Sequence, residues 1–161
     1  MVGPSGSGKT AWIQNHKSSF EGNVLVVSRD AIRFSLVSED EDYFSKEKEV
    51  FREFINQIKN GLENNNVVIA DATHITTGSR TKLFRALGDS IKDVKVIAIV
   101  IKPTLNECLE HNENRTGRSF VPRSQIRRMW YQFTAPTIDE GFDEIWTYKD
   151  YKYEIETKEV D

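Results

Sequence analysis

The chain has 161 residues, of which 38% are hydrophobic and 29% are charged, and its formal net charge is −3. This length and composition are typical of one folded domain with a single sizeable core. No apolar run is long enough to cross a bilayer and no signal peptide pattern is found, so a membrane protein is not expected. The acidic balance argues against broad binding to nucleic acid.

Cysteine usage points to a cytoplasmic protein. Cys108 is the only cysteine, so the chain cannot form an internal disulfide. Leu105 precedes it by three residues and Leu109 follows it, which is the spacing of an apolar helix face. We therefore expect a core cysteine rather than a nucleophile.

The first motif lies at residues 3–10, which read GPSGSGKT and fit the Walker A pattern G-x-x-x-x-G-K-[ST]. Glycines let successive backbone N–H groups turn inward as an anion nest, and a helix expected at 9–20 adds its N-terminal N–H groups. Lys9 would reach the β- and γ-phosphates of ATP, and the Thr10 hydroxyl would hold Mg²⁺. The predicted nucleotide-binding residues are Gly3, Ser5, Gly6, Ser7, Gly8, Lys9 and Thr10. The alternative is a flexible Gly/Ser-rich terminus, which needs neither Lys-Thr nor a helix after it.

A Walker A loop normally follows a buried strand, but only Met1 and Val2 precede it here. We expect that the first strand is truncated in this sequence and that the natural protein starts several residues upstream with an apolar run. The N-terminus of the native protein, measured by mass spectrometry, tests this expectation.

The remaining elements alternate between strands and helices. In chain order we expect a strand at 23–28, a helix at 45–62, a strand at 67–71, a helix at 79–87 and a strand at 94–101. A Thr104–Glu107 capping box then opens a helix, and a loop follows at 116–121. The last elements are a helix from Pro122, which carries Ile126, Met129, Trp130 and Phe133, and closing strands at 144–148 and 151–157. This order predicts an α/β fold, a three-layer P-loop NTPase sandwich with a parallel sheet and a small helical lid. We expect one domain over residues 1–161 with the lid at about 112–123.

Carboxylates follow two of the predicted strands. Asp30 comes directly after 23–28, where it could accept the proton of an attacking hydroxyl. Arg33 lies one helical turn further and could grip a phosphate or carboxylate of the acceptor. The alternative is that Asp30 caps the new helix and Arg33 pairs with it.

Asp71 ends the strand at 67–71 and is a candidate Mg²⁺ ligand together with Thr10. His74 follows in the same loop, and we assign it no proton-transfer role. Because ligands of parallel sheets gather at the carboxyl ends of the strands, the Walker A loop, Asp30 and Asp71 should converge on one site.

Basic residues mark the predicted lid. Arg115 and Arg118 lie on a loop between helices that can close over ATP and place positive charge beside the transferring phosphoryl group. Either arginine could instead form a surface salt bridge. Residues 77–134 carry eleven Lys or Arg against five Asp or Glu, so the acidic chain has a basic middle that suits a local anion-binding surface or an ordinary solvated face.

Four segments in this order, GPSGSGKT, SRDAIR, VVIADATH and NRTGRSFVP, resemble the P-loop kinase family that contains the phage and eukaryotic polynucleotide 5′-kinases. Members of that family are often called AAA-type ATP-binding proteins or predicted kinases. The resemblance runs from Gly3 to about Phe133. It implies that Lys9 and Thr10 carry ATP and Mg²⁺ and that Asp30 is the general base.

The resemblance further implies that Arg33 binds a phosphate of the acceptor and that Arg115 is the lid arginine, with Arg118 at a second basic lid position. Asp71 resembles the Asp of a D-x-T-N motif in which His74 replaces Asn.

The predicted function is therefore an ATP-dependent kinase, with the γ-phosphate moving to a hydroxyl, most naturally a polynucleotide or nucleotide 5′-OH. Two alternatives stay open. One is a kinase of the same fold that acts on a small molecule. The other is an ATP-binding switch or interaction module without an acceptor. The oligomeric state is not predicted.

Overall fold

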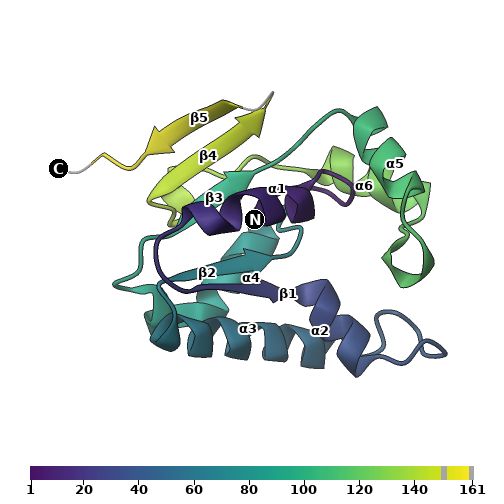
Figure 1. The fold of residues 1–161 in the computed structure, drawn as a ribbon, viewed down its shortest axis with the longest axis horizontal. Coiled ribbons are helices and arrows are strands. Elements are labelled where there is room, and N and C mark those ends of the chain that lie inside the picture. Colours follow the sequence, from purple (N-terminus) through teal and green to yellow (C-terminus); the bar gives the residue numbers. More distant parts are fainter. Residues whose placement is uncertain (150–151, 160–161) are drawn as a thin grey trace. The chain divides into compact units, whose positions relative to one another are not determined.

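The computed structural model describes residues 1–149 and 152–159. Its helices and strands, in chain order, are α1 (Lys9–His16), η1 (Lys17–Ser19), β1 (Val24–Ser28), α2 (Arg29–Leu36), α3 (Glu47–Asn64), β2 (Val67–Asp71), α4 (Thr77–Leu87), η2 (Gly88–Ile91), β3 (Ile97–Val100), α5 (Leu105–Glu113), η3 (Gly117–Ser119), α6 (Arg123–Gln132), η4 (Ile138–Glu140), β4 (Glu144–Lys149) and β5 (Lys152–Thr157), where η marks a 3₁₀ helix (Figure 1).

Strand pairing is mostly parallel, and the predicted α/β fold class is confirmed. β1 pairs with β2 in parallel, with Val24 opposite Val67 and Ser28 opposite Asp71. β3 pairs with β4 in parallel, and β4 turns back on β5 as an antiparallel hairpin. The chain divides into two compact units, one of residues 1–11 and 73–161 and the other of residues 12–72.

The unit of residues 1–11 and 73–161 is built on β3, β4 and β5. Val2 extends this sheet beside β3, because its N–H donates to Ile99 O (2.8 Å) and its carbonyl accepts from Ile101 N (2.8 Å). Val2 also joins a buried core with Ala98, Val100, Phe142 and Ile145. Of the two residues before the Walker A loop, Val2 therefore forms a single parallel β-bridge, with Val100 at the carboxyl end of β3.

Helices α5 and α6 of the same unit pack through a second small core of Cys108, Leu109 and Ile126. Cys108 is 0% exposed, and burial raises the pKa of its thiol to about 11. The thiol is therefore neutral and inert at pH 7. The expectation of a core cysteine is confirmed.

The unit of residues 12–72 places α3 beside β1 and β2 (Figure 1). The predicted apolar face of this helix is buried through Val50, Phe54, Ile55 and Ile58. From β1 the side chain of Val27 is buried, and Ile69 is buried from β2. Alternating helix and parallel strand thus share one core, as the hydrophobic periodicity indicates.

Several predicted boundaries shift for local reasons. The helix expected at 9–20 ends at His16 and continues as the 3₁₀ helix η1. α4 begins at Thr77, two residues earlier than expected, because Thr76 and Ser79 form a capping box. The strand expected at 94–101 narrows to Ile97–Val100, and α6 ends one residue before Phe133. Of the strand expected at 151–157, Tyr151 lies outside the described residues and the rest is β5.

Among the described residues, none of the helices has the length and apolar character that crossing a membrane requires.

Candidate functional site

The Walker A loop leaves the sheet directly after Val2. The Gly3 N–H donates to Thr73 O (2.9 Å), and the Ser7 N–H closes a turn on Pro4 O (3.2 Å). Lys9 then begins α1, so the loop leads into the N-terminus of a helix. The loop thus lies between one β-bridge, Val2 with Val100, and the N-terminus of a helix, which is the order of elements around a Walker A motif.

Two glycines give the loop its shape. Gly6 has φ +79° and Gly8 has φ +96°, both in the left-handed region that favours glycine. A Cβ at Gly6 would lie 2.2 Å from the backbone oxygen of Cys108, whereas a Cβ at Gly8 would meet no heavy atom within 4 Å. The loop is therefore pressed against α5 on one side and open beside Gly8 on the other.

Polar groups of the loop fit a phosphate ligand. Ser7 is 4% exposed, and its buried Oγ has no hydrogen-bond partner among the residues that the structure describes. The Lys9 ammonium is folded onto the loop, where Nζ donates to Gly3 O and Pro4 O (2.9 Å each). Ser5 is half-buried, and Thr10 is exposed in the first turn of α1. A buried hydroxyl without a partner, a nearby cation and a helix N-terminus together suit an anion with several oxygens.

His111 and Asn112, in the last turn of α5, were not singled out for a role in the sequence. His111 Nδ1 donates to Gly6 O (2.8 Å) and so ties the Walker A loop to α5. The buried Asn112 side chain donates to Val121 O (2.8 Å) and accepts from Val121 N (3.0 Å). Residues 105 apart form the first contact, so no local pattern could have revealed it.

The predicted lid lies between α5 and α6 and contains η3. Arg115 and Arg118 are both half-buried on it, and the Arg115 N–H donates to Asn112 O (3.0 Å). The alternative of a surface salt bridge is not seen for Arg115 among the described residues, whereas Arg123 pairs with Glu113. Both predicted lid arginines therefore belong to the same compact unit as the Walker A loop.

The unit of residues 12–72 holds the predicted acceptor residues. The N-cap of α2 is Ser28, whose side chain accepts from Ala31 N (3.4 Å), so Asp30 is not the capping residue. Arg33 Nη1 donates to Asp30 Oδ1 (2.5 Å), as the pairing alternative predicted. The Asp30 side chain is 67% exposed while that of Arg33 is 6% exposed.

Arg29 of the SRDAIR segment completes this cluster together with two residues that sequence reasoning missed, Tyr43 and Glu47. Tyr43 OH donates to Asp30 Oδ1 (3.1 Å) and accepts from Arg33 Nη1 (3.2 Å). Glu47 Oε2 accepts from Arg33 Nη2 (2.8 Å), and Glu47 Oε1 pairs with Arg29. The only signal in the sequence was the acidic first turn of α3, which contains Glu47. It could not identify Arg33 as the partner, because a carboxylate there meets α2 only through tertiary packing.

Electrostatics keep this cluster charged. Burial by itself raises the pKa of Glu47, but the hydrogen bond from Arg33 and the charge of Arg29 outweigh it and lower that pKa below its usual range. Burial lowers the pKa of Arg33, but the hydrogen bonds and charges of Glu47 and Tyr43 together outweigh burial, so that this pKa is raised above its usual value. Burial and the charge of Asp30 raise the pKa of Tyr43, so its hydroxyl stays protonated and can donate.

Asp71 ends β2 at the position that pairs with Ser28 at the end of β1. Asp30 and Asp71 therefore arise at the same edge of the two-stranded sheet. Within the part of the chain that the structure describes, no group of three or more His, Cys, Asp or Glu side chains could hold a metal ion. The pairing of Asp71 with Thr10 at Mg²⁺ stays a prediction, because the two belong to different units.

His74 has a structural place. It is buried at φ +43°, and its Nδ1 donates to Met1 O (3.0 Å). This contact ties the loop after β2 to the first residue of the chain. The predicted convergence of the Walker A loop with Asp30 and Asp71 stays a prediction for the same reason as the metal pair.

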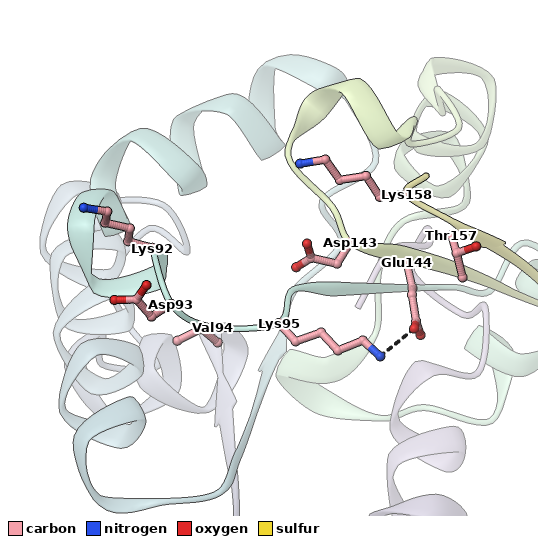
Figure 2. A pocket seen from close by; sticks show the side chains of 8 residues that line it. All are labelled: Lys92, Asp93, Val94, Lys95, Asp143, Glu144, Thr157 and Lys158. Atoms are coloured by element: carbon pink, nitrogen blue, oxygen red, sulfur yellow. Dashed lines mark ion pairs between the residues drawn. The ribbon is translucent and has the colours of Figure 1, made fainter. Parts of the chain in front are cut away.

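None of these residues lines one pocket of about 610 Å³ in the unit of residues 1–11 and 73–161. Figure 2 shows Lys95 and Glu144 paired across its wall (2.5 Å), with Asp143 and Lys158 nearby. Lys95 and Glu144 lie at the amino ends of β3 and β4, whereas the Walker A loop follows the carboxyl end of β3. Since ligands of parallel sheets bind at carboxyl ends, this pocket is not the nucleotide site.

Comparison with known protein families gives one match. Residues 1–136 fit the family model described as an AAA domain. No curated protein matches the chain.

Proposed function

Because this chain belongs to the AAA domain family, a P-loop class that binds nucleotides, we propose that it is an ATP-dependent phosphotransferase. In this proposal the γ-phosphate of ATP moves to a hydroxyl group, and the acceptor is the 5′-OH of a polynucleotide or nucleotide. The protein acts as a kinase in the cytoplasm with Mg²⁺, and it needs no membrane.

The observation that carries the proposal is the Asp30–Arg33 pair. An exposed carboxylate directly follows the carboxyl end of β1, and a buried guanidinium fixes it at 2.5 Å. A module that only bound ATP would need no such base. The pair therefore favours transfer to an acceptor over a switch without one.

Each proposed role follows from the chemistry of its residue. The Walker A backbone, Ser7 and Lys9 bind the phosphates, and Asp30 takes the proton of the acceptor hydroxyl. Arg33, whose side chain is 6% exposed, orients Asp30, and Arg115 and Arg118 add positive charge from the lid. Mg²⁺, held by Thr10 and Asp71, would neutralise charge on the phosphate oxygens.

Asp30→Asn tests the proposal. The amide keeps an oxygen that can accept from Arg33 and Tyr43, but it cannot take a proton. We expect phosphate transfer to a 5′-hydroxyl oligonucleotide to fall about 100-fold or more, while ATP affinity stays unchanged. The measurement is the transfer of label from γ-labelled ATP with Mg²⁺, beside calorimetric ATP binding.

The matched control is Asp89→Asn, since Asp89 is exposed in η2. Equal transfer by Asp30→Asn and the parent removes Asp30 from the role of base. Label on small hydroxyl compounds but not on the oligonucleotide moves the acceptor to the small-molecule class. ATP binding without transfer to any acceptor favours the switch.

A further inference from the structure

The Asp30 carboxylate is held through one of its two oxygens. Arg33 Nη1 (2.5 Å) and Tyr43 OH (3.1 Å) both donate to Oδ1. No described residue makes a hydrogen bond or ion pair with Oδ2, and the side chain is 67% exposed. One oxygen is thus fixed by two donors, and the other is left to accept a proton from solution or from a ligand.

The Tyr43 hydroxyl links the two predicted acceptor residues. It donates to Asp30 and accepts from Arg33 Nη1 (3.2 Å), so the three groups form a closed triangle of hydrogen bonds. The Arg33 guanidinium also lies over the Tyr43 ring, with Cζ 4.7 Å from the centroid of that ring. The hydroxyl and the ring therefore act on the pair in separable ways.

Hydrogen bonds and an ion pair hold the connection between α2 and α3, which carries Tyr43, in one conformation. Lys46 Nζ donates to Leu36 O (2.9 Å) and pairs with Glu41 (3.0 Å), while Glu41 accepts from Ser38 N (2.8 Å). These bonds pin both ends of the connection to each other. A side chain on a loop held in this way loses less conformational entropy when it is ordered than a side chain on a flexible loop.

Glu47 holds Arg33 from the other end. Its carboxylate accepts from Arg33 Nη2 (2.8 Å) and also pairs with Arg29. The Arg33 side chain is 6% exposed and that of Glu47 is 35% exposed, so Arg33 cannot move away without breaking a partly buried ion pair. The donor that reaches Asp30 is therefore fixed by α3.

We propose that Tyr43 is a positioning residue for phosphate transfer, whose hydroxyl holds Asp30 Oδ1 so that Oδ2 takes the proton of the acceptor. This inference rests on the proposed kinase function. In the step, the acceptor O–H bond breaks and its electron pair forms the bond to the γ-phosphorus. The bond from that phosphorus to the bridging oxygen breaks, ADP leaves with its electrons, and the proton ends on Oδ2.

Tyr43→Phe tests the inference, because it removes the hydroxyl and keeps the ring over Arg33. We expect kcat for labelling of a 5′-hydroxyl oligonucleotide to fall about tenfold, with the KM for ATP unchanged. The decisive measurement adds Asp30→Asn. If Tyr43 acts through Asp30, the double variant transfers phosphate at the rate of Asp30→Asn alone.

Tyr131→Phe is the matched control, since Tyr131 is 72% exposed on α6. Transfer by Tyr43→Phe at the parent rate overturns the inference and leaves the kinase proposal standing. An equal tenfold loss on top of Asp30→Asn, or a raised KM for ATP, also overturns it. A parent protein that transfers phosphate neither to the oligonucleotide nor to a small hydroxyl compound overturns the proposed function and this inference together.

Discussion

Single residues of the Walker A loop depend on a backbone conformation that other side chains rarely adopt. At Gly6 two constraints coincide, a φ of +79° and a backbone oxygen 2.2 Å from the position of a Cβ. His111 holds the carbonyl of the same residue. The conformation of the loop therefore requires glycine at position 6, and a hydrogen bond from His111, 105 residues further along the chain, holds the loop in place.

Gly6→Ala is expected to weaken both the fold and nucleotide binding. A left-handed alanine costs about 1–2 kcal/mol, and the methyl group must push the loop away from Cys108 O. We expect ATP affinity to fall at least about tenfold, measured by calorimetry, with a lower urea midpoint. Gly78→Ala is the control, because a Cβ at Gly78 meets nothing within 4 Å. Unchanged ATP affinity in Gly6→Ala would contradict a phosphate nest at this position.

At the scale of elements, buried charged pairs join helices to segments distant in sequence. Arg80 of α4 is 1% exposed and donates to both carboxylate oxygens of Glu140 in η4 (2.6 and 2.8 Å). Its Nη1 also donates to His74 O and Thr134 O (3.0 Å each). One guanidinium therefore connects α4, the loop before it and the segment after α6.

Glu140→Gln is expected to destabilise the protein by about 3 kcal/mol at pH 7, because it leaves the buried Arg80 without an anion. The hydrogen bond from Arg80 lowers the pKa of Glu140. Its stabilisation is therefore complete above the unfolded pKa of about 4.5 and is lost as the pH falls through the lower folded value.

Urea unfolding at pH 7 and pH 3 measures both effects. The difference in the free energy of unfolding between the parent and Glu140→Gln should be smaller at pH 3 than at pH 7. The exposed control Asp139→Asn should have the same free energy of unfolding as the parent at pH 7. A difference between parent and Glu140→Gln that is the same at both pH values would show that ionisation of Glu140 does not contribute.

At the scale of the whole molecule, the chain forms two compact units, with the Walker A loop and the predicted lid in one and the Asp30 cluster in the other. Cys108 is fully buried in the first of these units and is the only cysteine. Its reaction with a thiol reagent in increasing urea therefore reports the opening of the unit that carries the Walker A loop.

Lys9→Ala is expected to remove stabilisation by nucleotide. ATP with Mg²⁺ at about 100 times its dissociation constant should stabilise the parent by about 2.7 kcal/mol and delay labelling of Cys108. The variant lacks the ammonium that lies against Gly3 O and Pro4 O, so its labelling should respond far less at the same ATP concentration. Lys17→Ala, at an exposed position, should behave like the parent. An equal shift in Lys9→Ala would argue against the assignment of Lys9 to the phosphates.

Features that lie within one stretch of chain can be predicted from the sequence. The Walker A loop with its glycines, the Thr104–Glu107 capping box, the buried face of α3 and the core position of Cys108 all follow from local spacing. Such patterns are readable because backbone geometry relates neighbouring residues directly.

The partners of these residues follow from the packing of the folded chain. Arg33 meets Glu47 across 14 residues, Arg80 meets Glu140 across 60, and Gly6 meets His111 across 105. Which carboxylate reaches a given arginine depends on how helices pack, and no periodicity along the chain records it. For this reason the sequence named Asp30 and Arg33 but missed Tyr43, whose hydroxyl joins them through a folded loop.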